Sequence, residues 1–248
     1  MGFSLVNTSS TNVLKYNMFL GTYVLCSSVV SDALVFLQCL TSGRWTTLSI
    51  SFMSLATCIG REQNVFAETS GYADRVLFDS PVLMYTDLKQ LKEFDQEHYR
   101  TETFALCYNA SQFSLQQAIE SLCKKVAHSV KEHQTVIVIL SDKNPTQEQL
   151  VIPAPLALGA VQEVLVSSQL RCDTNIIVES GGVRNSHQLA VLIGLGATAV
   201  YPYLAYETVE QYVANGDIQL SAKQAISNYR KGLNKGLLKI MSKMGIAT

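Results

Sequence analysis

The run Thr-Val-Ile-Val-Ile-Leu at residues 135–140 is the feature that most limits the fold of this chain. It is continuously apolar after its first residue and rich in β-branched side chains, without the polar alternation of a half-exposed strand. A strand of this kind is buried on both faces, which is typical of a parallel sheet covered by helices. The run therefore predicts a parallel sheet in the interior of an α/β domain.

Strand-like and helix-like segments alternate on either side of this run, which extends the prediction to the whole α/β part of the chain. The expected strands are residues 104–109, 135–140, 175–179 and 197–203. The expected helices are residues 112–132, with Ser111 or Ser114 as the cap, then 156–168, 185–195 ending at Gly196, 207–213 and 221–244. Such βα units predict right-handed crossovers and a mainly parallel sheet. Because a closed eight-unit barrel takes about 250 residues, we expect an incomplete or modified TIM-barrel-like fold.

Residues 1–52 differ in composition from the rest of the chain. They contain only three charged side chains, Lys15, Asp32 and Arg44. The mostly apolar stretch 18–40 is long enough to span a bilayer, but Asp32 and several serines interrupt it. We therefore expect residues 1–52 to be an irregular N-terminal extension rather than a membrane anchor, and residues 53–248 to form the folded domain.

The charge and cysteine content exclude several classes of function. The formal net charge is -1 and there is no basic run, so a nucleic-acid partner is not expected. The six cysteines and four histidines are scattered rather than clustered at the spacing of a zinc site. Scattered cysteines are typical of reduced, buried thiols, which indicates a cytoplasmic protein.

Three segments follow expected strands and should meet at the carboxyl end of the sheet, where α/β proteins carry their sites. They are residues 141–144, 179–184 and 201–207. The Gly181–Gly182 turn has two interpretations, a phosphate cradle at a helix N-terminus or a tight turn without a ligand. The bulky Tyr201-Pro202-Tyr203 sequence stands where a second phosphate-binding turn would be wanted.

Other residues near these ends have both a structural and a catalytic interpretation. Glu179 and Glu207 could face one another as an acid–base pair, although structural hydrogen bonding is commoner for such carboxylates. His187 is a capping or packing residue unless a partner orients it. A further polar loop, Gly60, Arg61, Glu62, Gln63 and Asn64, lies between apolar residues and is either an ordinary turn or a contact loop to another domain.

Several longer motifs carry a resemblance to a known family. They are MSLATCIGREQNVF at 53–66, SPVL at 80–83, LRCDTNIIVE at 170–179, AVLIGLGATAVYPYLAYET at 190–208, NYRKGLNKGL at 228–237 and MSKMGI at 241–246. In this order they resemble the central domain of the glutamate synthase large (alpha) subunit. The resemblance covers residues 53–248 and excludes residues 1–52.

The resemblance implies a part of a larger enzyme that makes glutamate from glutamine, 2-oxoglutarate and reducing equivalents in ammonia assimilation. The expected partners are the glutaminase and FMN domains of the same polypeptide, with a small subunit as an optional addition. FMN and an iron-sulfur cluster belong to the full-length enzyme and not to this domain. The electron donor, ferredoxin or NADPH, stays open.

The chain departs from the family pattern at both ends. Met1-Gly2 stands where a glutaminase domain would have its nucleophilic cysteine, and the chain reaches Thr248 where the FMN domain would begin. No catalytic, cofactor-binding or metal-binding residue is therefore carried over, and we expect the chain alone to be inactive. The alternative is an independent FMN- or phosphate-binding barrel oxidoreductase.

The resemblance also gives the loop from Gly60 to Asn64 a hypothetical role. It places the loop near the glutaminase side, where ammonia would pass toward the flavin domain. Neutral ammonia is best passed by small residues and amide groups, because a fixed charge would hold ammonium. Gly60 and Asn64 fit this requirement, whereas Arg61 and Glu62 would have to point away or pair with each other, since an unpaired desolvated charge is costly.

Overall fold

A computed structural model describes residues 6–8, 11–18, 21–26, 53–62, 75–93 and 99–247. The chain divides into two compact units. One comprises residues 1–54, 63–74 and 241–248, and the other comprises residues 55–62 and 75–240. Each unit is described by itself, and the second contains the parallel sheet.

The first unit contains a small antiparallel sheet where we expected irregular structure. Strands β1 (Val6–Thr8), β2 (Thr11–Met18) and β3 (Gly21–Cys26) pair in sequence order. Of the apolar stretch 18–40, Met18 ends β2 and residues 21–26 form β3, and the rest lies outside the described residues. Among the helices of the described residues, none combines the length and apolarity needed to cross a bilayer.

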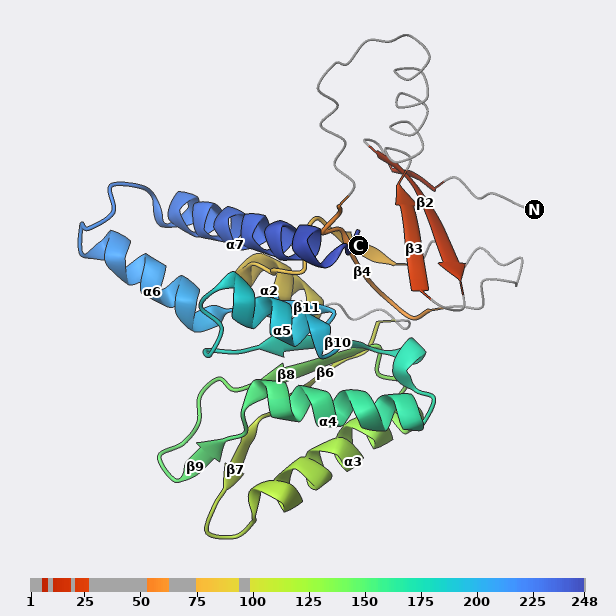
Figure 1. The fold of residues 1–248 in the computed structure, drawn as a ribbon. Coiled ribbons are helices and arrows are strands. Elements are labelled where there is room, and N and C mark those ends of the chain that lie inside the picture. The colour runs from red at the N-terminus through yellow and green to blue at the C-terminus, as the bar shows by residue number, and fades with distance from the viewer. Residues whose placement is uncertain are drawn as a thin grey trace, which may run out of the picture. The chain divides into compact units, whose positions relative to one another are not determined.

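The second unit is built on a four-stranded sheet in the order β11-β10-β8-β6 (Figure 1). Its strands are β6 (Thr101–Ala105), β8 (Ile137–Ser141), β10 (Asn175–Glu179) and β11 (Ala199–Tyr201). All neighbouring strands are parallel. Every residue of β8, β10 and β11 is buried, which confirms the parallel, doubly covered sheet predicted from residues 135–140.

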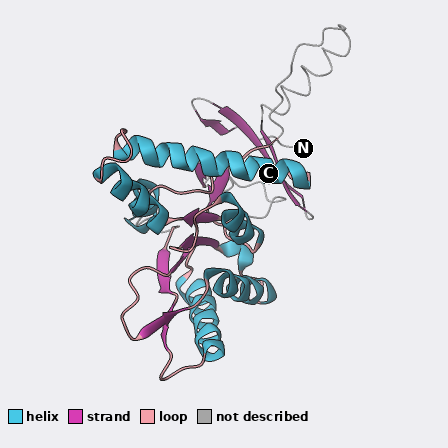
Figure 2. Cartoon of the chain, turned by 60° about the vertical axis from the view of Figure 1, so that its left-hand side comes forward, coloured by secondary structure: helices cyan, strands magenta, loops and turns pink. Residues whose placement is uncertain are grey.

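Three crossover helices cover one face of this sheet. They are α3 (Leu115–His133), α4 (Ala154–Ser167) and α5 (Ser186–Gly194), each joining one strand to the next. Because the strands step in one direction and the crossovers are right-handed, the three helices lie on the same side. Helix α4 packs against both α3 and α5, so the helices form one layer. Figure 2 shows the strands and helices from a second direction.

Helix α2 (Tyr85–Glu93) covers the opposite face. Alternate residues of a strand point to opposite faces, and Glu102 hydrogen-bonds Ser129 of α3. Thr101 has the opposite orientation, and its hydroxyl donates to the Leu91 carbonyl of α2. In a closed barrel this face would line the interior. The unit is thus an incomplete barrel in which a helix fills the inner side.

A short segment before α2 extends the sheet at its β11 edge. Val82 forms a parallel bridge with Val200. The Leu83 amide donates to the Val200 carbonyl at 3.0 Å, and the Val200 amide donates to the Pro81 carbonyl at 2.8 Å. A segment that precedes all four strands of the parallel sheet therefore lies beside the last of them, as first and last strands do in a closed barrel.

The remaining elements are two small antiparallel sheets of two strands each, a 3-10 turn and two C-terminal helices. They are β4 (Thr57–Ile59) paired with β5 (Val76–Phe78), β7 (Cys107–Asn109) paired with β9 (Gln149–Val151), the 3-10 turn η2 (Arg171–Asp173), α6 (Tyr203–Ala214) and α7 (Ala222–Met244).

Most expected elements are present, but several boundaries were wrong. The expected strand 104–109 is two strands separated at Leu106, which donates its amide to the Ser141 carbonyl and accepts from the Ile152 amide. Helix α3 begins after Ser114, which forms a capping box with Gln117. Helix α6 begins directly after Pro202, earlier than the predicted residue 207, because proline suits a helix start.

Arg171 ties three elements together at the amino end of β10. Its guanidinium donates to Gln162 Oε1 of α4 at 2.7 Å, to the Thr174 carbonyl at 2.8 Å and to the Gly196 carbonyl at 3.1 Å. Gly196 has a φ of +111°, which is why a glycine follows α5 here. Burial lowers the pKa of the Arg171 guanidinium, so its hydrogen bonds compensate a real desolvation cost.

We predict that Arg171→Met lowers the free energy of unfolding by about 2 kcal/mol or more, because it leaves two backbone carbonyls and an amide oxygen without their donor. Urea unfolding followed by circular dichroism measures this. Arg184→Met, at an exposed position, is the control and should change stability by less than about 0.5 kcal/mol. Equal losses in the two variants would contradict the assigned role.

Candidate functional site

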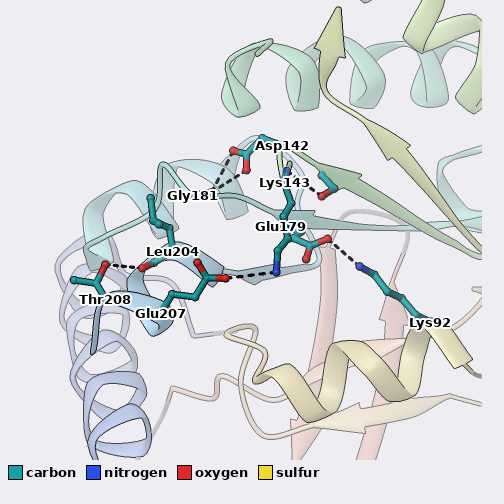
Figure 3. A network of polar contacts seen from close by, with 9 residues as sticks. Lys92, Asp142, Lys143, Glu179, Gly181, Leu204, Glu207 and Thr208 are labelled. Atoms are coloured by element: carbon teal, nitrogen blue, oxygen red, sulfur yellow. Dashed lines mark hydrogen bonds and ion pairs between the residues drawn. The ribbon is translucent and has the colours of Figure 1, made fainter. Parts of the chain in front are cut away.

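The three segments predicted to meet at the carboxyl end of the sheet do meet there (Figure 3). Asp142 follows β8, the Ser180–Gly182 turn follows β10, and Tyr203 opens α6 after β11. The Gly-Gly turn leads into α5, whose first turn is capped by Asn185. This is the position at which parallel α/β proteins bind anionic ligands.

The donors of the glycine turn are used by the Asp142 carboxylate. The Gly181 amide lies 2.9 Å from Asp142 Oδ1 and 3.2 Å from Oδ2. The Ser180 hydroxyl donates to Oδ2 at 2.6 Å and accepts from the Gly182 amide at 3.1 Å. A carboxylate of the chain itself thus occupies the place and makes the hydrogen bonds that a phosphate oxygen would take at such a turn.

Tyr203 packs against Gly181 of the glycine turn. A Cβ atom added at Gly181 would lie 2.9 Å from the Tyr203 hydroxyl, so the phenol is already in contact with the turn. Lys143 Nζ lies 5.1 Å from the centre of the Tyr203 ring. Burial first, and then the charge of Asp142 and a hydrogen bond to it, raise the pKa of Tyr203 to about 12. The phenol therefore stays protonated and donates to the carboxylate.

Two ion pairs flank this network. Lys92 Nζ of α2 lies 2.9 Å from Glu179 Oε2, and the Glu179 side chain is only 5% exposed. Lys143 Nζ lies 3.5 Å from Glu207 Oε1 in a more exposed pair. The two carboxylates considered as an acid–base pair are thus each bound to a lysine, which favours the structural interpretation of both.

His187 lines a cleft of about 380 Å³ together with Asp142, Pro153, Val183 and Leu192. It lies in the first turn of α5. Among the described residues no hydrogen bond or ion pair joins His187 to an acidic partner that would orient it. His187 is exposed, and the cap of α5 is Asn185.

The candidate loop from Gly60 lies at the other end of the sheet. The Asn175 amide group, at the start of β10, donates to the Gly60 carbonyl at 2.9 Å. The Glu62 amide donates to the Cys172 carbonyl at 2.9 Å. Gly60 has a φ of +150°. Gln63 and Asn64 lie outside the described residues.

The two charges of this loop pair with other residues and not with each other. Arg61 Nε lies 3.4 Å from Asp173 Oδ1, and Glu62 Oε1 lies 4.0 Å from Arg75 Nη1. Glu62 also raises the pKa of the Cys172 thiol, after burial as the larger cause. Each charge thus has a counter-charge within 4.0 Å, while Arg61 Nε makes no hydrogen bond among the described residues.

Sequence reasoning found the segments of the site but not all of its members. Lys92 was missed because it lies on α2, far from Glu179 along the chain, and no local pattern indicates that pairing. Asp142 was placed at the strand end, but its role depends on the later glycine turn. Within the described residues, no group of three or more His, Cys, Asp or Glu side chains could hold a metal ion.

Comparison with known proteins identifies the family. The model of the glutamate synthase central domain matches residues 50–248. The chain belongs to the glutamate synthase central domain family. It is 33% identical over 207 residues to ferredoxin-dependent glutamate synthase of Pyropia yezoensis and 31% identical over 195 residues to the glutamate synthase [NADPH] large chain of Bacillus subtilis. A ferredoxin-dependent enzyme of Arabidopsis thaliana, described as chloroplastic/mitochondrial, is 34% identical over 212 residues.

These relatives are much longer than this chain. Each match covers 79% of the chain but only 13% of the relative. Among solved structures, a flavocytochrome b2 mutant with benzoylformate is similar, with a TM-score of 0.46, 15% identity, and coverage of 68% of this chain and 36% of that chain. The central domain is therefore a small part of the polypeptides in which its relatives occur.

We predict that the Tyr203 phenol makes the stability of this central domain depend on alkaline pH. The folded pKa of about 12 lies above the ordinary value of 10, so the folded state retains a proton that the unfolded chain loses. The contribution is fully present below about pH 10 and is lost as the pH rises to about 12. Comparing urea unfolding of the wild type and Tyr203→Phe across this range measures it.

The exposed Tyr212, on the same helix, supplies the control for this prediction. Tyr212→Phe should leave the alkaline loss of stability as it is in the wild type. Asp142→Asn should bring the Tyr203 pKa down toward 10, because it removes the carboxylate charge. An unchanged pH dependence in Tyr203→Phe would contradict the prediction.

Proposed function

We propose that this chain serves as the central domain of a glutamate synthase, the oxidoreductase that makes glutamate from glutamine and 2-oxoglutarate, and that it neither binds flavin nor catalyses a reaction by itself. Its role is to space and couple the glutaminase and FMN domains of the longer polypeptide. The observation that carries the proposal is the Asp142 carboxylate in the glycine turn.

The residues at this turn do not fit the phosphate of FMN. A phosphate placed there would compete with Asp142 for the Gly181 amide, and like charges about 4 Å apart repel by about 4 kcal/mol at an effective dielectric of 20. Tyr203 already contacts the turn. Lys143, the nearest cation of the network, is paired with Glu207. These contacts favour a structural role of the turn over an independent FMN- or phosphate-binding barrel.

The proposed domain limits and partners follow from the same family membership. Residues 53–248 form the central domain, and residues 1–52 are an extension outside it. The partners are the glutaminase and FMN domains, and FMN and the iron-sulfur cluster belong to the rest of the enzyme. Cys107, Cys123 and Cys172 are reduced thiols, and we propose the cytoplasm, where thiols stay reduced.

We predict that the purified chain retains no flavin after incubation with excess FMN and gel filtration. The Gly181 and Gly182 amides already donate to Asp142 and Ser180, and the Tyr203 hydroxyl contacts the turn. Visible flavin absorbance at less than about a tenth of the protein concentration is the expected result, since affinity weaker than micromolar is lost on a column.

The double variant Asp142→Ser/Tyr203→Ser tests whether Asp142 and Tyr203 are the reason that the chain retains no flavin. It removes both the internal carboxylate and the phenol, so any weak flavin binding should increase in it and not decrease. Stoichiometric flavin in the wild type would refute the proposed function. The chain would then be the independent flavin-binding barrel.

The coupling role of the loop Gly60, Arg61, Glu62, Gln63 and Asn64 remains a hypothesis with its own test. We predict that Asn64→Leu, at the corresponding position of a full-length relative, lowers glutamine-dependent glutamate formation severalfold, because an apolar branch replaces an amide on the ammonia path. Glutamine hydrolysis and flavin reduction should persist, so the ratio of glutamate formed to glutamine hydrolysed should fall.

The matched control is Gln116→Leu, which removes an exposed amide on α3 that bonds only Glu120 among the described residues. It should leave the ratio of the two half-reactions at the wild-type value. If Asn64→Leu also left that ratio unchanged, the loop would be an ordinary turn with no part in ammonia transfer.

A further inference from the structure

Within the described part of the chain, strand β6 is an edge strand of the parallel sheet, with β8 as its one neighbour. In a strand, the backbone N–H and C=O groups of alternate residues point to opposite neighbours. The Arg100 carbonyl accepts from the Ile137 amide at 3.1 Å, and the Leu106 amide donates to the Ser141 carbonyl at 2.7 Å. The backbone N–H and C=O groups of the even-numbered residues of β6 therefore point toward β8. Thr101, Thr103 and Ala105 direct their backbone groups away from the sheet.

The free edge continues beyond β6. Strand β9 lies on the β8 side, because the Ile152 amide donates to the Leu106 carbonyl at 2.7 Å. The outer side of the chain from Thr101 to Cys107 is thus one edge of about 20 Å at 3.3 Å per residue. Among the described residues, no backbone group of Thr103 or Ala105 has a hydrogen-bond partner on that side, and both residues are exposed.

This edge lacks the features that usually keep edge strands from pairing. Residues 101–109 contain no lysine and no proline, and their one charge is Glu102. The Glu102 carboxylate accepts a hydrogen bond from the Ser129 hydroxyl, and His133 Nδ1 lies 3.8 Å from Glu102 Oε2. The opposite edge of the sheet is covered by Val82. A long, regular, unprotected edge is a template for another strand.

A groove of about 640 Å³ runs beside this edge. Thr103 and Ala105 line it on the strand side, and α3 forms its wall. Its apolar lining includes Phe104 and Leu122, with Phe113 at 52% exposure where α3 approaches. Lys125 lies on the wall, and no ion pair is present for it within the described residues. The groove therefore suits an extended segment with apolar and acidic side chains.

We propose that the edge Thr101–Cys107 and its groove bind an extended segment of the rest of the glutamate synthase polypeptide, which adds to the sheet as a strand beside β6. Its apolar side chains pack toward Phe104 and Leu122, and an acidic side chain lies opposite Lys125. We assign the added strand to the rest of the polypeptide because the central domain makes up only 13% of its relatives, so most of the polypeptide is available to cover the edge. This inference rests on the proposed function.

The test uses the 248-residue chain and synthetic peptides. Overlapping peptides of about 15 residues, long enough for a strand and its flanks, cover the Bacillus subtilis large chain outside the region that matches this chain. Binding is measured by fluorescence anisotropy, and amide hydrogen exchange is followed by NMR. At least one peptide should bind and slow exchange at Thr103 and Ala105 by about 10-fold or more.

Two variants at one position separate strand addition from side-chain contact. Thr103→Pro removes an outward N–H and fills its place with the ring, without removing a hydrogen bond to β8. It should weaken peptide binding by about 10-fold or more. Thr103→Val keeps the N–H and should bind within about 2-fold of the wild type. Both variants should melt close to the wild-type temperature, because Thr103 is exposed.

Three results would overturn the inference. One is that no peptide slows exchange at Thr103 and Ala105. A second is protection in the free chain that is lost on dilution, which would make the occupant a second copy. A third is protection independent of concentration, which would make it another part of this chain. Stoichiometric FMN binding would instead refute the proposed function, and the peptide measurements do not depend on it.

Discussion

The one-directional order of the parallel strands governs the rest of the described fold. Strands β6, β8, β10 and β11 step the same way, so their right-handed crossovers place α3, α4 and α5 on one face. In a closed barrel the strands themselves would cover the other face. Here helix α2 covers that face of the sheet and contributes a lysine side chain. Glu179, buried at the end of β10, then gains Lys92 as the counter-ion that a buried carboxylate requires.

The same order brings the strand ends together and explains how the glycine turn is used. A turn of this type presents backbone N–H groups to an anion, and leaving them unpaired beneath other side chains would cost free energy. Asp142 supplies the anion from the neighbouring strand end, and charge-assisted hydrogen bonds are the stronger kind. The turn thus retains the geometry of an anion site while its donors are satisfied within the chain. The site stabilises the junction of β8, β10 and α6.

The sequence was sufficient to predict an element wherever the signal for that element was local. Strand β10 has its predicted limits, and Ser114 was one of two predicted caps. The doubly buried β8 followed from its composition alone. The elements whose position depends on residues distant along the chain were not predicted. Helix α2 carries no strong local signal, and its position depends on contacts such as Thr101 to Leu91. The antiparallel pair of β7 and β9 joins residues about 40 positions apart, which no short-range pattern indicates.

The candidate site was predictable to a similar extent. The three strand-end segments and the obstructing tyrosine were visible as a pattern, because the carboxyl ends of parallel strands must meet. The pairing of Arg61 with Asp173 and of Glu62 with Arg75 was not visible, since the sequence alone left only the choice of pairing with each other or pointing away. Charges separated along the chain become partners only through the sheet.

Strand β10 connects the two ends of the parallel sheet and so bears on the proposed role of the domain as a spacer. At its start, Asn175 holds the Gly60 carbonyl, and Arg171 just before it joins α4 to the end of α5. At its end, Glu179 holds Lys92, and the following turn holds Asp142. These anchors are separated by about 13 Å of a fully buried strand at 3.3 Å per residue. A displacement of the Gly60 loop at one end can therefore reach the other end only by shifting the buried, hydrogen-bonded strand β10. A ladder packed on both faces resists such a shift, and this rigidity is what the proposed spacer role requires.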